Sequence, residues 1–170
     1  MFLKKYYPSE YAEDVFSIDY AELYRRGCRA ILFDIDNTLV AHGADSTEEV
    51  DELFRHIHSI GLKTLLLSNN NKKRIERFNQ NIHTTYLEEA GKPDPACYLK
   101  AVEMLGVTRE ETIVVGDQLF TDIYGANRAG IASILVKYIG YYKKEWKGYT
   151  RYIEKILLLL KGKGRGTWGK

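Results

Sequence analysis

The feature that most constrains the fold of this sequence is a series of short apolar runs, each of which ends in a cluster of polar residues. Longer segments with the residue spacing of amphipathic helices separate these runs. Such an alternation is typical of α/β proteins, in which helices cover both faces of a mainly parallel sheet. We therefore predict a sheet of five strands, at residues 30–33, 62–67, 84–87, 112–115 and 132–136.

Signals for the ends of helices agree with this pattern. Between the first two strands, Ser46 and Glu49 form a capping box ahead of an apolar helical face that ends at Gly61. Another crossover helix is predicted to begin after Asp94, which precedes a proline. Residues 1–27 are predicted to be an N-terminal helical segment that packs beside the sheet.

Composition narrows the class of protein. A chain of 170 residues without internal repeats or linkers predicts one domain over residues 1–170, with a basic tail at residues 161–170. The net charge of +2 is too small to indicate specific nucleic-acid binding. Cys28 and Cys97 are far apart, which favours a reducing cytoplasm over a disulfide framework. No apolar run approaches the roughly twenty residues that span a membrane, and no signal peptide is expected.

Polar side chains gather after the predicted strands, where ligands bind in open parallel sheets. The candidates are Asp34, Asp36, Ser68, Asn69, Lys92, Asp117 and Asp122. Because the carboxyl ends of parallel strands meet at one edge of the sheet, we expect these residues to converge there.

The four aspartates indicate a metal site. Asp34 and Asp36 are two residues apart in an extended segment, so both side chains can face the same side. Adding Asp117 and Asp122 brings together negative charges whose repulsion would be costly without a hard divalent cation. Magnesium is the natural choice, because it prefers oxygen ligands and retains waters and phosphate oxygens among them.

The remaining candidates are donors for a phosphate group. Ser68 has a hydroxyl group, the next backbone amide has an N–H, and Lys92 has a fixed positive charge. Each signal alone is weak, because Asp-x-Asp is often a turn and serine often caps a helix. The spacing excludes a calcium-binding loop, and no glycine-rich nucleotide loop occurs. The combination favours phosphoryl transfer.

In chain order these segments resemble the four motifs of the haloacid dehalogenase (HAD) superfamily, which has a Rossmann-like fold. The matching residues are Asp34-Ile-Asp36-Asn-Thr38, Ser68-Asn69, Lys92 and Gly116-Asp117-x-x-x-x-Asp122. The resemblance implies that Asp34 is the nucleophile that forms an aspartyl-phosphate. It implies that Asp36 is a general acid and base, which must start protonated.

The same resemblance implies the other roles. Magnesium would be held by Asp34, the main-chain carbonyl of Asp36 and Asp117, with Asp122 supporting a bound water or a neighbouring ligand. Ser68, the Asn69 amide and Lys92 would stabilise the transferring phosphoryl oxygens.

The spacing of the motifs leaves no room for a substantial cap domain, so we expect an open site. An open site suits substrates whose bulk stays outside it, such as proteins, nucleic acids or lipid headgroups. The chain resembles the HAD-IIIA branch of YqeG type, whose relatives act as phosphatidylglycerophosphate phosphatases. We therefore expect a magnesium-dependent phosphatase for that phospholipid, cytoplasmic and peripheral at the inner membrane face.

Two alternatives stay open. One is a capless phosphatase for phosphoproteins or nucleic-acid ends. The other, of a different class, is a phospho-acceptor switch or binding module, against which Asp36 argues because a switch has no leaving group to protonate.

The C-terminal region has two interpretations. An apolar helical stripe precedes the basic tail and consists of Tyr149, Tyr152, Ile153, Ile156, Leu157 and Leu160. It is typical of a last helix that covers the sheet, and it would also suit contact with anionic lipid.

Overall fold

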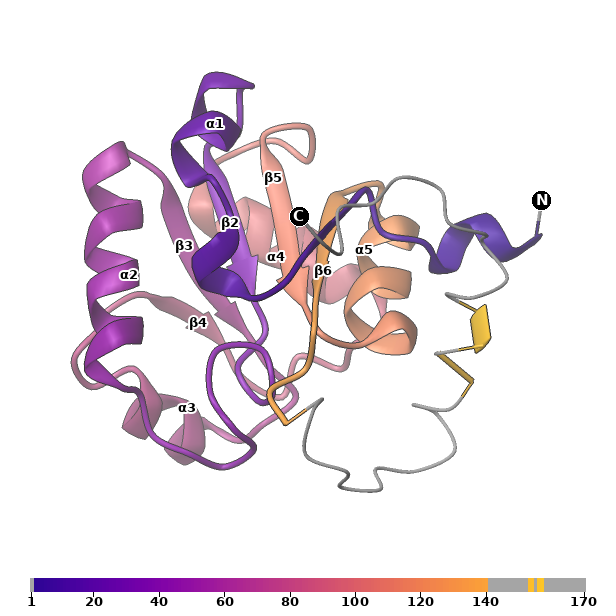
Figure 1. The fold of residues 1–170 in the computed structure, drawn as a ribbon. Coiled ribbons are helices and arrows are strands. Elements are labelled where there is room, and N and C mark those ends of the chain that lie inside the picture. Colours follow the sequence, from indigo (N-terminus) through magenta and orange to yellow (C-terminus); the bar gives the residue numbers. More distant parts are fainter. Residues whose placement is uncertain (1, 141–152, 155, 158–170) are drawn as a thin grey trace.

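The computed structural model describes residues 2–140, 153, 154, 156 and 157, and its centre is one parallel sheet (Figure 1). The order of the six strands is β1-β6-β5-β2-β3-β4. Their bounds are β1 Glu10–Ala12, β2 Ala30–Phe33, β3 Lys63–Leu67, β4 Thr85–Leu87, β5 Thr112–Gly116 and β6 Ala132–Val136. The predicted Rossmann-like α/β fold is confirmed.

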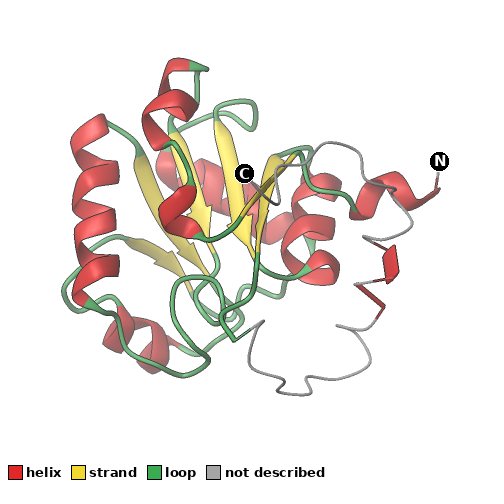
Figure 2. Ribbon diagram, in the orientation of Figure 1, coloured by secondary structure: helices red, strands yellow, loops and turns green. Residues whose placement is uncertain are grey.

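Helices lie on both faces of the sheet, as Figure 2 shows. They are η1 Phe2–Tyr6, η2 Val15–Ser17, α1 Tyr20–Arg25, α2 Glu48–Ile60, α3 Lys72–Phe78, α4 Pro95–Leu105, η3 Leu119–Ile123 and α5 Tyr124–Ala129. Side chains of β2 alternate between the two faces of the sheet. Ile31 and Phe33 pack with α1, α2 and α3 on one face. Ala30 and Leu32 pack with α4 and α5 on the other. Each face therefore has its own apolar core.

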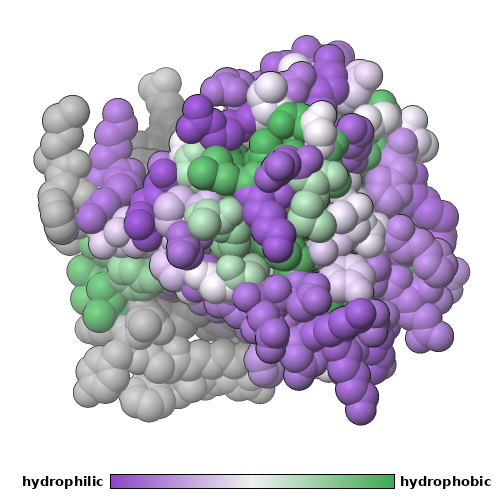
Figure 3. Space-filling view, turned by 180° about the vertical axis from the view of Figure 1, so that it is seen from behind, coloured by the Kyte–Doolittle hydropathy of each residue, from purple (hydrophilic) through white to green (hydrophobic). Residues whose placement is uncertain are grey.

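The second of these faces also exposes apolar side chains. Figure 3 shows the molecule from behind, where hydrophobic residues are exposed at the surface and hydrophilic residues surround them. Leu99 and Met104 of α4 are among the exposed large hydrophobic residues. Scattered apolar residues of this kind are normal on a protein surface.

The N-terminal segment corrects two predictions. Residues 1–27 are not wholly helical, because Glu10–Ala12 forms β1 and pairs in parallel with β6. The sheet therefore has six strands and not five. This strand has three residues, all exposed or partly exposed, so it lacks the buried apolar run that identified the others.

The start of α2 corrects a smaller detail. The N-cap is Thr47, whose side chain accepts a hydrogen bond from the Val50 amide, and not Ser46. The Ser46 hydroxyl instead donates to the carboxylate of Asp51. The predicted end is confirmed, because Gly61 adopts the left-handed conformation that closes the helix.

The register of the central strands places their ends level with one another. Phe33 of β2 aligns with Leu66 of β3 on one side and with Val115 of β5 on the other. The residues that follow these strands therefore emerge at the same edge of the sheet.

Few residues of the C-terminal region are described. The basic tail at residues 161–170 and half of the apolar stripe lie outside them. Of the stripe, Ile153 and Ile156 are exposed, whereas Leu157 packs against an apolar cluster that includes Leu119 and Ile123. No helix in the described ranges is long and apolar enough to cross a membrane.

Candidate active site

Asp34 stands at the end of the central strand β2. Its amide donates a hydrogen bond to the Val115 carbonyl, which extends the pairing of β2 with β5 by one residue. The chain then turns sharply, because the carbonyl of Ile35 accepts hydrogen bonds from the amides of Thr38, Leu39 and Val40. Ile35, which lies between the two aspartates, is fully buried.

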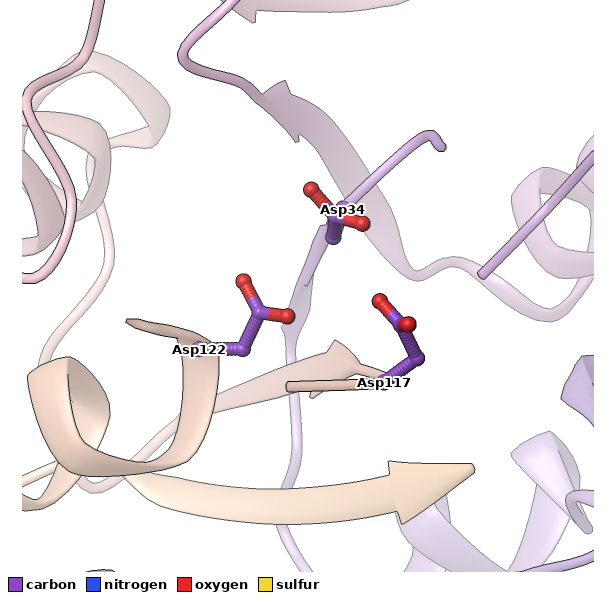
Figure 4. A group of neighbouring side chains, drawn as sticks. All are labelled: Asp34, Asp117 and Asp122. Carbon is purple, nitrogen blue, oxygen red and sulfur yellow. The ribbon is translucent and has the colours of Figure 1, made fainter. Parts of the chain in front are cut away.

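Three of the predicted aspartates form a cluster. Asp34, Asp117 and Asp122 each have a carboxylate oxygen within 4.8 Å of those of the other two. Figure 4 shows the three carboxylates turned toward one another, from the ends of β2 and β5 and from η3. Thr38 joins two of them, since its Oγ1 lies 3.0 Å from Asp34 and 3.1 Å from Asp117.

Lys92 lies within this cluster. Its Nζ is 2.6 Å from Asp34 and 2.7 Å from Asp122, and its side chain is only 5% exposed. Burial alone would lower the pKa of Lys92, but Asp122 and Asp34 outweigh it and raise that pKa well above its ordinary value. Lys92 is therefore a fixed positive charge.

The side chain of Asn69 holds the backbone of Lys92 in place. Its Oδ1 accepts a hydrogen bond from the Lys92 amide at 2.8 Å, and its Nδ2 donates to the Lys92 carbonyl at 3.2 Å. The loop after β3 thus positions the lysine that precedes α4.

The charge of the cluster fits a divalent cation. Burial raises the pKa of Asp34 to about 6. The positive charge of Lys92 acts to lower this pKa, and the negative charge of Asp122 acts to raise it. Three carboxylates against one ammonium group leave an excess of negative charge in a largely buried place. A hard cation with oxygen ligands, such as Mg²⁺, matches this donor set.

Asp36 lies outside that cluster of three. Its carboxylate accepts hydrogen bonds from the Gly43 amide at 2.8 Å, from Arg74 at 3.0 Å and from Asn70. Burial would raise the pKa of Asp36, but these hydrogen bonds and the charge of Arg74 outweigh burial and lower it. In the form described, Asp36 is an ionised carboxylate.

Ser68 connects to Asp36 through Asn70. The Oγ of the buried Ser68 accepts from the amide and from Nδ2 of Asn70, at 3.1 and 2.9 Å. The same Nδ2 donates to Asp36. Ser68 and Asp36 are therefore neighbours, with Asn70 between them.

The structure adds residues that the sequence reasoning did not assign. Thr38 ends the first motif and Asn70 directly follows the second, but neither position by itself indicates a role. Arg74 had no signal beyond its charge, because its contact with Asp36 depends on how α3 lies against the loop after β2.

Comparison with known proteins agrees with this geometry. The family model for haloacid dehalogenase-like hydrolases matches residues 41–130. A probable phosphatase of Bacillus subtilis, YqeG, is 33% identical over 169 residues, which are 98% of this chain and 98% of that protein. This chain belongs to the haloacid dehalogenase-like hydrolase family. It is a HAD phosphatase, as the sequence motifs predicted.

Two further similarities come from a relative and from a solved structure. Phosphatidylglycerophosphate phosphatase 1 of Arabidopsis thaliana is 29% identical over 143 residues, which are 76% of this HAD phosphatase and 40% of that protein. The cobalt-bound deoxy-D-mannose-octulosonate 8-phosphate phosphatase of Haemophilus influenzae has a TM-score of 0.50 at 16% identity, covering 85% of this chain and 93% of that one. The latter similarity supports the fold alone.

Proposed function

We propose that this HAD phosphatase hydrolyses a phosphomonoester in two steps, with Asp34 as the nucleophile. The observation that supports this most directly is the place of Asp34, at the end of the central strand, 2.6 Å from Lys92 and beside Asp117 and Asp122. The lysine and a bound cation would offset the negative charge of the substrate, so that a carboxylate can approach phosphorus.

In the first step, the Asp34 carboxylate forms a bond to phosphorus while the bond from phosphorus to the leaving oxygen breaks. Asp36 gives a proton to that oxygen and becomes a carboxylate. In the second step, water attacks phosphorus and gives a proton to Asp36, and the bond to Asp34 breaks to release phosphate. The ionised state of Asp36 in the structure suits the second step; in the first step Asp36 must carry a proton.

Other residues bind the phosphate and the cation. Ser68, the Asn69 amide and Lys92 would donate hydrogen bonds to the phosphoryl oxygens. Asp34, the carbonyl of Asp36 and Asp117 would hold Mg²⁺, with Asp122 acting through a water or a neighbouring ligand. When bound, the cation supplies positive charge near the phosphoryl oxygens.

The proposed substrate is phosphatidylglycerophosphate at a membrane surface. Within residues 2–140, the segments that separate the motifs contain only the strands of the sheet and the helices α2, α3 and α4 with their loops, and none of them forms a cap domain. An open site can act on a headgroup whose lipid chains remain in the membrane. The named activity of the Arabidopsis relative supports this choice of substrate. The enzyme would then work from the cytoplasm at the inner membrane face.

The test is Mg²⁺-dependent phosphate release from phosphatidylglycerophosphate in mixed micelles, compared with phosphopeptides, oligonucleotide ends and small phosphomonoesters. Asp34→Asn serves as the control and should lose turnover at unchanged fold. Preference for the lipid supports the proposed substrate, and preference for another substrate class replaces it. An active Asp34→Asn enzyme would remove Asp34 from its role.

A further inference from the structure

Arg74 of α3 contacts both Asp36 and the loop that follows β2. Its Nη2 donates hydrogen bonds to Oδ1 of Asp36 at 3.0 Å and to the Ala44 carbonyl at 2.7 Å. The guanidinium lies 5.7 Å from the ring centre of the buried Phe78, and its side chain is 11% exposed. The group is thus held by its own helix, by the loop and by Asp36.

The two oxygens of the Asp36 carboxylate have different partners. Oδ1 accepts from Arg74 and from the Gly43 amide, whereas Oδ2 accepts from Asn70 Nδ2. Nδ1 of the exposed His42 also lies near Oδ2, at 3.9 Å. That same nitrogen lies 2.9 Å from the Ser68 hydroxyl, one of the proposed phosphate donors. Oδ1 is therefore held by hydrogen bonds from the loop and from α3, whereas the hydrogen bond to Oδ2 comes from the side of Ser68.

We infer that Arg74 is a positioning residue that fixes Asp36 so that Oδ2 exchanges the proton with the leaving oxygen. The inference rests on the proposed function. As the leaving oxygen takes the proton from Oδ2, Asp36 becomes a carboxylate whose Oδ1 stays bound to Arg74. When water later attacks phosphorus, its proton returns to Oδ2 in the same orientation.

The remaining donors of Arg74 argue against a purely structural role. Nε and Nη1 are buried, and neither has a hydrogen-bond partner among the described residues. Leaving buried donors unsatisfied disfavours the folded state, so most buried polar groups have partners. An apolar side chain at this place would avoid that cost but would lose the hydrogen bonds to Asp36 and to the Ala44 carbonyl. The contact with Asp36 gives a reason for a buried guanidinium.

Arg77 offers a matched control on the same helix. It donates to the Gly43 carbonyl at 2.9 Å and pairs with Asp45, so it also ties the loop to α3. None of its hydrogen bonds within the described structure reaches Asp36. Loss of Arg77 therefore loosens the loop without removing a partner of Asp36.

The experiment compares two substrates that differ in their need for a proton. An alkyl phosphomonoester has a poor leaving group that needs protonation, whereas p-nitrophenyl phosphate releases a stable anion. The measured quantity is kcat/KM, which reports only the steps through release of the leaving group. The variants are Arg74→Met, Arg74→Lys, Arg77→Met and Asp36→Asn.

We expect Arg74→Met to lower the alkyl-to-aryl ratio of kcat/KM by about tenfold. A general acid typically accelerates a reaction by roughly a hundredfold or more, and the variant should lose only part of this acceleration. Arg74→Lys should recover part of the ratio, and Arg77→Met should leave it unchanged. Equal losses on both substrates in Arg74→Met, or the same shift in Arg77→Met, would overturn the inference. If Arg74→Met does not fold, Arg74→Lys decides by the same ratio.

Asp36→Asn separates this inference from the proposed function. If Asp36→Asn lowers kcat/KM for the alkyl substrate selectively while both Arg74 variants keep the wild-type ratio, only the role of Arg74 is wrong. If Asp36→Asn affects both substrates equally, the general-acid role of Asp36 fails, and the inference about Arg74 fails with it.

Discussion

The side chain of Asp122 occupies the space that a Cβ atom on Gly116 would need. An ideal Cβ at residue 116 would overlap the Cβ, Cγ and Oδ2 atoms of Asp122. Oδ2 is held there by the amide of Gln118, and Oδ1 contacts Lys92. The glycine that ends β5 therefore allows Asp122 to reach the carboxylate cluster.

Gly116→Ala should displace Asp122 and lose most of the phosphatase activity. Because both residues are buried, we expect a loss of about 1–3 kcal/mol in the free energy of unfolding from overpacking. Phosphate release and denaturant unfolding measure the two effects. An alanine variant with wild-type activity and stability would contradict the placement of Asp122.

Lys92→Met should make the fold depend on a divalent cation. The change leaves Asp34 and Asp122 without their shared ammonium group, and removing one partner of a buried ion pair typically costs about 3–5 kcal/mol. We expect Mg²⁺ to raise the melting temperature of this variant more than that of the wild type, relative to EDTA. Lys100→Met, at an exposed position of α4, should respond to Mg²⁺ as the wild type does.

Protons should compete with Mg²⁺ at Asp34. The pKa of this carboxyl is raised to about 6 in the metal-free protein, and only the ionised form can bind the cation. Below pH 6, the apparent Mg²⁺ affinity should therefore fall by about tenfold per pH unit, and above pH 6 it should level off. Calorimetric titration at several pH values measures this.

The same raised pKa acts in the opposite direction on the stability of the metal-free protein. A group whose pKa rises on folding stabilises the folded state at acid pH, and this contribution is lost as the pH rises through about 6. Asp45→Asn, in an exposed loop position, should leave the Mg²⁺ profile unchanged. An affinity independent of pH between 4 and 6 would show that Asp34 is not a ligand.

Glu154→Ala should destabilise the turn that carries Asp122. The buried Glu154 carboxylate accepts a hydrogen bond from the Leu119 amide at 3.0 Å, at the start of η3. Loss of a capping acceptor costs about 1 kcal/mol, so the melting temperature should fall. Glu154→Gln keeps an acceptor oxygen, so its melting temperature should fall less. Ile153→Ala, at an exposed neighbouring position, should change the melting temperature little. An equal effect of the alanine and glutamine variants would contradict the capping role.

The carboxylate cluster was predictable because buried parallel strands appear in sequence as apolar runs. Once the ends of β2 and β5 were located, Asp34 and Asp117 had to lie at one edge of the sheet. The strand β1 was not predictable, because its three residues lack a buried apolar run. Its pairing with β6 depends on where the first segment packs.

The surroundings of Asp36 were beyond the reach of sequence reasoning for a different reason. Extended geometry predicted that Asp36 would face the same side as Asp34, but the chain turns at once, with Asn37 in a left-handed conformation. The path of that turn and of the loop at Gly43 decides that Asp36 meets Arg74. Such paths arise from tertiary contacts and not from residue spacing.

The contact between Glu154 and Leu119 also has a consequence for how the enzyme is made. All the proposed catalytic and binding residues lie between positions 34 and 122, so they leave the ribosome before position 154 does. Until that glutamate emerges, the first amide of η3 lacks its acceptor. A nascent or truncated chain that lacks Glu154 would thus contain every reactive group, but η3, which carries Asp122, would lack the hydrogen bond that caps its first amide.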